Sequence, residues 1–205
     1  MNIPKLSAVL LMVCSVLVSL SRAMPEELVR AKIGIQRKSG DRTIQAKARD
    51  RLKAGDLLRI YVLPKDDVYV YVVHTDRKRV TLLNQGQKVP QGASLVLPAP
   101  TEFYQIVGTQ PQEIFTIICS PTELSELLTL FRSENPSYAQ WASLEEDLLR
   151  KSRIDLGQQP EKPFAIAGNV RGLGNGEGID PFLAQLRVYS GKSLLVRRYE
   201  FRVKK

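Results

Sequence analysis

The run of residues from Val68 to Val73 constrains the fold more than any other part of the sequence, because all six side chains are valine or tyrosine. β-Branched and aromatic residues favour strands, in which successive side chains point to opposite faces of the sheet. A strand that is apolar or aromatic on both faces is typical of the interior of a domain. The run therefore predicts an interior β-strand.

Short strand-like segments separated by turn residues extend along most of the chain. Residues 57–63 place Leu58, Ile60 and Val62 on one face, and the turn-prone residues 54–56 precede them. Similar patterns predict further strands at residues 31–35, 43–46, 79–83, 94–97, 103–107, 113–119, 164–170, 185–189 and 194–203. Closely spaced strands joined by turns are typical of antiparallel sheets, so we expect an antiparallel β-sandwich or partial barrel.

Two helices are predicted between residues 120 and 153. Ser120 and Pro121 fit the N-cap and the first helical position, and Glu123 follows the cap by three residues. Apolar residues then recur with helical spacing at Leu124, Leu127, Leu128 and Phe131. A second helix fits residues 137–153, where Trp141 lies in register with several leucines and is expected to be a core anchor. The chain is therefore predicted to be mainly β with two helices, an α+β protein.

The first 23 residues have the three parts of a secretory signal peptide. Lys5 gives the positive start, residues 8–20 are apolar, and Ser21 and Ala23 are the small residues of a cleavage site. The apolar run is shorter than the ~20 residues that a membrane-spanning helix needs, which disfavours a retained anchor. We expect cleavage after Ala23, a single β-rich domain over residues 24–205, and a periplasmic or secreted protein without an integral membrane span.

Cys119 and His74 would each be the single residue of its type once residues 1–23 are removed. Cys119 ends the apolar run 114–119, where a cysteine behaves as a small buried hydrophobe, so we expect an inert core residue. His74 continues the strand face of Val68, Val70 and Val72 and is expected to close that face near a turn. A single histidine excludes a histidine-rich metal site.

No motif assigns a catalytic, cofactor-binding or metal-binding residue. The glycine-rich residues 172–178 lack a glycine at the sixth place of a dinucleotide-binding fingerprint, so we expect a surface loop there. Carboxylates gather at residues 66–67 and 145–147, as they do in solvated turns and helix faces. A hydrolase that uses scattered carboxylates or a Cys119–His74 pair remains the alternative to a non-enzymatic protein.

Basic residues are concentrated near both ends of the predicted domain. Residues 30–53 hold nine basic and two acidic residues, and residues 187–205 hold seven basic and one acidic. If these ends meet in space, they form a positive face that attracts an anionic polymer or an acidic partner. A solvated surface that only aids solubility is the alternative. The candidate anionic-partner surface consists of Arg37, Lys38, Arg42, Lys47, Arg198, Arg202, Lys204 and Lys205.

Several strand motifs between residues 53 and 120 carry a resemblance to a known family. Gly55-Asp56 opens an apolar strand, residues 69–73 alternate tyrosine and valine before a final valine, and residues 80–84 read Val-Thr-Leu-Leu-Asn. Leu97-Pro98 and a strand that ends at Ser120-Pro121 complete the likeness. The segment resembles the bacterial family catalogued as "domain of unknown function 4384". The resemblance implies an exported β-rich module, often an accessory part of envelope or surface proteins, with no established catalytic residues.

These features together predict an exported, non-enzymatic accessory or binding module of the bacterial envelope. We expect its partner to be an envelope protein or an anionic envelope polymer, contacted through the basic surface. Neither a nucleic acid nor a cofactor or metal is expected.

Overall fold

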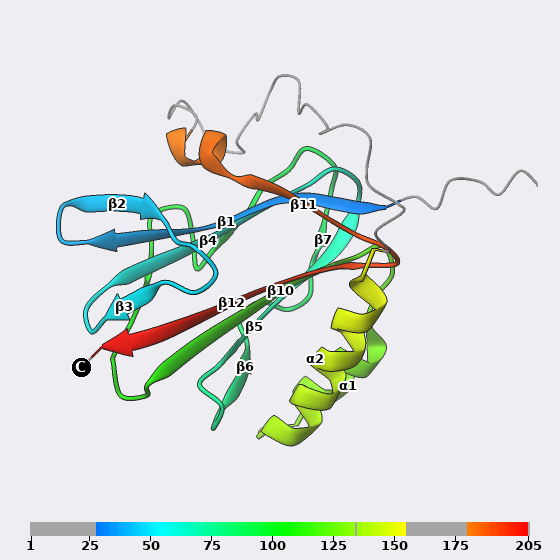
Figure 1. Cartoon of the computed structure of the whole chain (residues 1–205). Helices are drawn as coiled ribbons and strands as arrows, with labels where there is room; N and C mark the ends of the chain where they lie inside the picture. The colour runs from blue at the N-terminus through cyan, green and yellow to red at the C-terminus, as the bar shows by residue number, and fades with distance from the viewer. Residues whose placement is uncertain (1–27, 134, 155–179, 205) are drawn as a thin grey trace, which may run out of the picture.

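A computed structural model describes residues 28–133, 135–154 and 180–204 (Figure 1). The predicted signal peptide, the strand predicted at residues 164–170, the glycine-rich residues 172–178 and Lys205 lie outside the described residues. The strands are β1 (Val29–Ser39), β2 (Arg42–Gln45), β3 (Arg51–Lys53), β4 (Leu57–Pro64), β5 (Val68–Thr75), β6 (Val80–Leu82), β7 (Lys88–Val89), β8 (Leu95–Leu97), β9 (Tyr104–Gln105), β10 (Gln112–Ser120), β11 (Arg187–Gly191) and β12 (Leu195–Lys204). The helices are α1 (Ser125–Phe131), α2 (Tyr138–Ser152) and the 3-10 helix η1 (Pro181–Gln185).

The strands form two sheets. The first has the order β11-β1-β4-β8, with β2 also paired to β1 and β9 to β4. The second has the order β3-β12-β10-β5-β6, with β7 also paired to β5. Among the described strands, every pairing is antiparallel except that between β3 and β12, which run parallel. The prediction of a mainly antiparallel β structure with two helices is confirmed.

One hydrophobic core lies between the two sheets. Ile33 and Ile60 of the first sheet share this core with Val70, Ile117 and Phe201 of the second. All five side chains are fully buried, which follows from strand alternation when one face of each sheet turns inward. The two sheets therefore pack as a sandwich, and the interior strand predicted at residues 68–73 is the body of β5.

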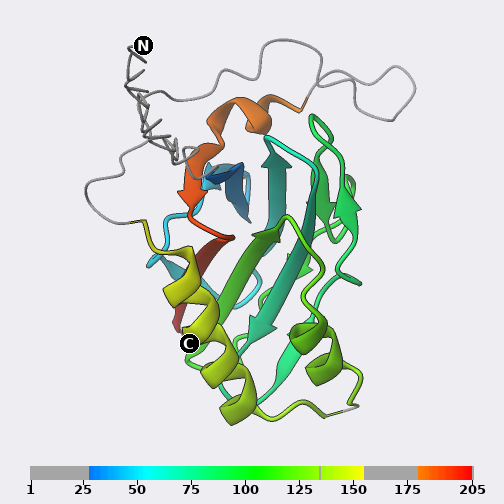
Figure 2. The same ribbon diagram turned by 90° about the vertical axis from the view of Figure 1, so that its right-hand side faces the viewer.

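The outer face of the second sheet is covered by α1 and α2 (Figure 2). Trp141 of α2 is fully buried in one cluster with Leu127 of α1 and with Tyr71 and Ile118 of the sheet, so the predicted core anchor is confirmed. On the first sheet, Phe182 of η1 packs against Tyr61, with ring centroids 4.9 Å apart. In the described part of the chain, no helix combines the length and the apolar character that crossing a membrane requires.

The predicted start of the first helix at Ser120 is wrong. Ser120 is the last residue of β10, and its hydroxyl donates to the Thr122 carbonyl at 2.6 Å instead of capping a helix. The helix begins at Ser125, and the preceding Leu124 donates its backbone N–H to the Tyr71 hydroxyl at 2.9 Å. A tertiary contact with the sheet therefore sets this helix end, which local capping signals do not reveal.

Candidate anion-binding surface

The parallel pair of β3 and β12 places like charges side by side. Arg51 lies opposite Arg202, and Lys53 lies opposite Lys204. Leu52, between the two basic residues of β3, is buried in the sandwich core, so its neighbours point to the outer face. The backbone hydrogen bond from Glu200 N to the Ala48 carbonyl, 2.8 Å long, continues this register and sets Arg49 beside Glu200. We call the exposed residues Arg49, Arg51, Lys53, Arg202 and Lys204 the basic strip.

Turns built on two aspartates hold β3 in place. The Asp50 carboxylate accepts the Lys47 backbone N–H at 2.8 Å, and the Asp56 carboxylate accepts that of Lys53 at 2.8 Å. Asp56 is almost fully buried and also pairs with Arg37 at 2.8 Å. The chain thus crosses from β2 in the first sheet to β3 in the second at the edge of the sandwich, near the end of β12 (Figure 1).

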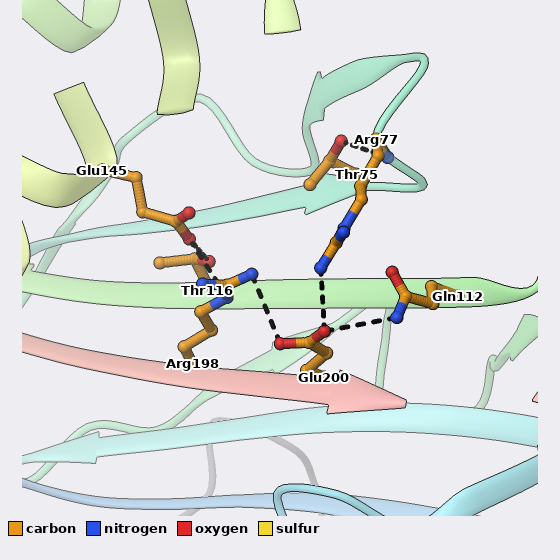
Figure 3. Close-up of polar contacts among 7 residues, drawn as sticks. All are labelled: Thr75, Arg77, Gln112, Thr116, Glu145, Arg198 and Glu200. Carbon is orange, nitrogen blue, oxygen red and sulfur yellow. Dashed lines mark hydrogen bonds and ion pairs between the residues drawn. The ribbon is translucent and has the colours of Figure 1, made fainter. Parts of the chain in front are cut away.

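Glu200 borders the basic strip, and its carboxylate is already engaged (Figure 3). It accepts from Arg77 Nη2 at 3.0 Å and from Gln112 Nε2 at 3.4 Å, and it pairs with Arg198 Nη2 at 3.4 Å. Two guanidinium groups therefore neutralise this one carboxylate. Glu200 leaves the positive charge of the basic strip largely uncompensated.

A hollow of about 360 Å³ lies on this surface, lined by Arg49, Arg51, Glu200 and Arg202. Within the described ranges, the five residues of the basic strip form no ion pair with an acidic side chain. Like charges directly opposite each other on neighbouring strands repel. An anion in the hollow would relieve that repulsion, so the arrangement is suited to binding one.

The structure separates the eight residues predicted from sequence. Arg202 and Lys204 belong to the basic strip, and the exposed Lys47 lies two residues before Arg49. Arg198 is partly buried against Glu145 and Glu200, at 3.8 and 3.4 Å.

Three others lie elsewhere, and Lys205 is outside the described residues. Arg37 is bound to Asp56, and Arg42 is exposed beside the turn that joins β1 and β2. Strand alternation directs Lys38 to the outer face of the first sheet, whereas Arg202 points from the outer face of the second. The eight residues therefore do not all share one face.

Arg49, Arg51 and Lys53 lie within the basic run of residues 30–53 but are absent from the predicted surface. Their signal was present, since basic residues recur at every second position from Lys47 to Lys53. In β3 that spacing places Arg51 and Lys53 on one face, whereas Arg49 lies in the turn that precedes the strand.

The structure does not bring Cys119 and His74 together. Phe115 lies opposite His74 and Cys119 lies opposite Val70, which separates the two residues by four strand positions, about 13 Å. His74 is instead paired with Glu113, with Nε2 and Oε2 2.6 Å apart, and its ring lies 4.8 Å from that of Phe115. Burial of Cys119 raises the pKa of its thiol to about 12, which suits a core residue and not a nucleophile.

A thiol reagent should not label Cys119 in the native protein at pH 8.5, where an ordinary cysteine is about half ionised. The full chain with Cys14→Ser would carry only this thiol. We expect labelling to reach one thiol per chain after unfolding in guanidinium chloride, as followed by mass spectrometry. Rapid labelling of the folded protein would contradict the buried position and favour the hydrolase alternative.

Three of the five carboxylates at residues 66–67 and 145–147 are engaged locally. Asp147 pairs with Lys151 at 2.6 Å and with Arg150, and the bond from Lys151 lowers the pKa of Asp147 below its ordinary value. Glu145 is buried and accepts a hydrogen bond from Thr116. Asp67 accepts the Gln91 backbone N–H at 2.9 Å and pairs with Lys88. Among the described residues, no group of three or more potential metal-ligating side chains is suited to a metal ion.

Comparison of the chain with protein-family models, with curated proteins and with solved structures gave no match.

Proposed function

We propose that this protein is an exported, non-enzymatic binding module of the bacterial envelope that contacts an anionic polymer or an acidic partner through the basic strip. The observation that carries the proposal is the cross-strand pair of Arg51 and Arg202. Both side chains are exposed, both line the hollow, and neither has an acidic partner in the described ranges. A pair of like charges held by strand register is better suited to recognition than to stability.

The fold supports a rigid presentation of these charges. β12 is paired on both sides, with β10 and with β3, so the basic strip stands on a fixed part of the sheet. A fixed backbone beneath the charges lowers the ordering cost of binding. The envelope location rests on residues 1–23, whose pattern is that of a signal peptide, and agrees with the family resemblance of residues 53–120.

The proposal is tested by reversing two charges of the basic strip. We expect the double variant Arg51→Glu and Arg202→Glu to lose at least about tenfold in binding to isolated bacterial envelope fragments, because two charge-assisted contacts become repulsive. Cosedimentation at low salt measures the effect. Binding of the wild-type protein should also weaken with salt, since the Debye length falls from about 10 Å at 0.1 M to about 3 Å at 1 M.

The matched control is Lys38→Glu with Arg42→Glu, which changes the net charge equally outside the basic strip. We expect this control to bind within about twofold of the wild type, because its charges lie away from the hollow. Melting curves should show that both double variants fold, since all four side chains are exposed. An equal loss of affinity in both double variants would mean that binding depends on net charge alone. Unchanged affinity in both would mean that the basic strip is an ordinary solvated surface.

A further inference from the structure

The basic strip has a regular spacing that restricts what it can bind. In β3, Arg51 and Lys53 are two residues apart, so their Cα atoms lie about 6.6 Å apart, and Arg49 precedes them in the turn that Asp50 N closes on the Lys47 carbonyl. Across the pair, Arg51 and Arg202 stand on strands about 4.8 Å apart, and so do Lys53 and Lys204. The charges thus form two cross-strand pairs, which we call rungs. One rung is Arg51 with Arg202 and the other is Lys53 with Lys204, and Arg49 precedes the first rung.

We propose that the basic strip binds a linear phosphodiester polymer without nucleobases, which runs along β3 and β12 with successive phosphates on the two rungs. This inference rests on the proposed function and names the chemistry of its ligand. A ladder of cations matches a chain with evenly repeated charges better than a single small anion, because the second contact is made within the same complex.

The side chains that line the hollow favour phosphate over carboxylate. Three of its four lining residues are arginines, whose planar guanidinium forks donate paired hydrogen bonds to phosphate oxygens. Arg51 and Arg202 rise side by side from one sheet face, so they approach an anion from two directions. A phosphate, which is tetrahedral, offers acceptor positions in several planes, whereas the acceptors of a carboxylate lie in one plane.

Glu200 sets one end of the site. Glu200 lines the hollow together with Arg49, and its carboxylate is paired with the guanidinium groups of Arg77 and Arg198 (Figure 3). An anionic chain therefore meets a neutralised wall at Glu200 and open positive charge toward Lys53 and Lys204. None of the described residues that line the hollow is aromatic, so they offer no platform on which nucleic-acid bases could stack.

The inference is tested with the full chain and four defined probes at equal anionic charge concentration. These are poly(glycerol phosphate), poly-α-glutamate of the same charge number, a single-stranded oligodeoxythymidine, and vesicles of phosphatidylglycerol in phosphatidylcholine. We expect poly(glycerol phosphate) to bind about tenfold more tightly than poly-α-glutamate by calorimetry or fluorescence anisotropy. We also expect it to exceed the oligonucleotide and the vesicles.

Variants of the strip separate charge from geometry. Arg51→Lys with Arg202→Lys keeps both charges but removes the forks, so affinity for poly(glycerol phosphate) should fall while the salt dependence stays close to that of the wild type. Arg51→Gln with Arg202→Gln should weaken the affinity, and it should make the negative slope of log K against log salt shallower by about 1. The control Lys38→Gln with Arg42→Gln should change neither.

Failure of this inference can be told from failure of the proposed function. Equal or tighter binding of poly-α-glutamate, with a loss in the Arg51→Gln and Arg202→Gln variant, would overturn the phosphodiester ligand and keep an anion-binding strip. A preference for the vesicles would assign the strip to a lipid headgroup, and a preference for the oligonucleotide would assign it to nucleic acid. Binding to none of the probes, with intact binding of the Arg51→Glu and Arg202→Glu variant to envelope fragments, would overturn both proposals.

Discussion

Val70→Asp should abolish stable folding. Val70 is fully buried on the inner face of β5, opposite Cys119 of β10 and within the core between the sheets. An aspartate there would be surrounded by apolar side chains, and burying a carboxylate without a partner costs several kcal/mol even when it is protonated. That cost is comparable to the whole stability of a small domain, about 5–15 kcal/mol. Circular dichroism and urea unfolding would measure the loss.

The matched control places the same substitution at an exposed valine. Val107 is 72% exposed, so Val107→Asp should change the free energy of unfolding by no more than about 0.5 kcal/mol. The pair of variants separates burial from the chemistry of the substitution. A Val70→Asp protein that unfolds at the same urea concentration as the wild type would contradict the burial of the Val70 side chain between the sheets.

The central strands could be predicted because their burial follows the two-residue period of a strand. β12 is the clearest case, since Leu195, Tyr199 and Phe201 are buried on one face, as their alternation indicates. Arg197 interrupts that face in the sequence. In the structure its guanidinium lies over the rings of Tyr189 and Tyr199, at 4.5 and 5.3 Å from their centroids, which accommodates the charge.

Elements that depend on distant partners could not be predicted. β3 has only three residues, and it is a strand because its backbone pairs with β12, about 150 positions later in the chain. The helix start at Ser125 depends in the same way on the Tyr71 hydroxyl. Local propensity does not contain either contact.

At the candidate site, too, the sequence predicts what depends on local composition and not what depends on contacts between distant residues. The sequence revealed the concentration of basic residues near both ends, but not which charges are neutralised. Arg37 is bound to Asp56 and Arg198 to Glu145 through contacts between different parts of the fold, and Arg198 also pairs with Glu200 of its own strand. These pairings decide which cationic side chains are available to a ligand. Arg37 is engaged by Asp56, whereas Arg49 and Arg51 are exposed.

Trp141→Ala should destabilise the protein by about 3–5 kcal/mol, the range for large aromatic residues removed from a core. Trp141 is fully buried between α2 and the second sheet, and its ring lies 6.0 Å from that of Phe131 near the end of α1. Removing it leaves a cavity that both helices border, so their attachment to the sheet weakens. Urea unfolding followed by far-ultraviolet circular dichroism measures the change without relying on tryptophan fluorescence.

Trp141→Phe should cost much less, and the reason is specific to this site. The indole Nε1 is buried with no hydrogen-bond partner among the described residues, so the wild-type side chain already bears an unsatisfied donor. Phenylalanine loses some packing, which destabilises the protein. It also removes the unsatisfied donor, whose burial costs about 1–3 kcal/mol, so the two effects on the free energy of unfolding oppose each other. If Trp141→Phe is as unstable as Trp141→Ala, the indole N–H has a hydrogen-bond partner. If Trp141→Ala is as stable as the wild type, α2 does not depend on this residue for its place on the sheet.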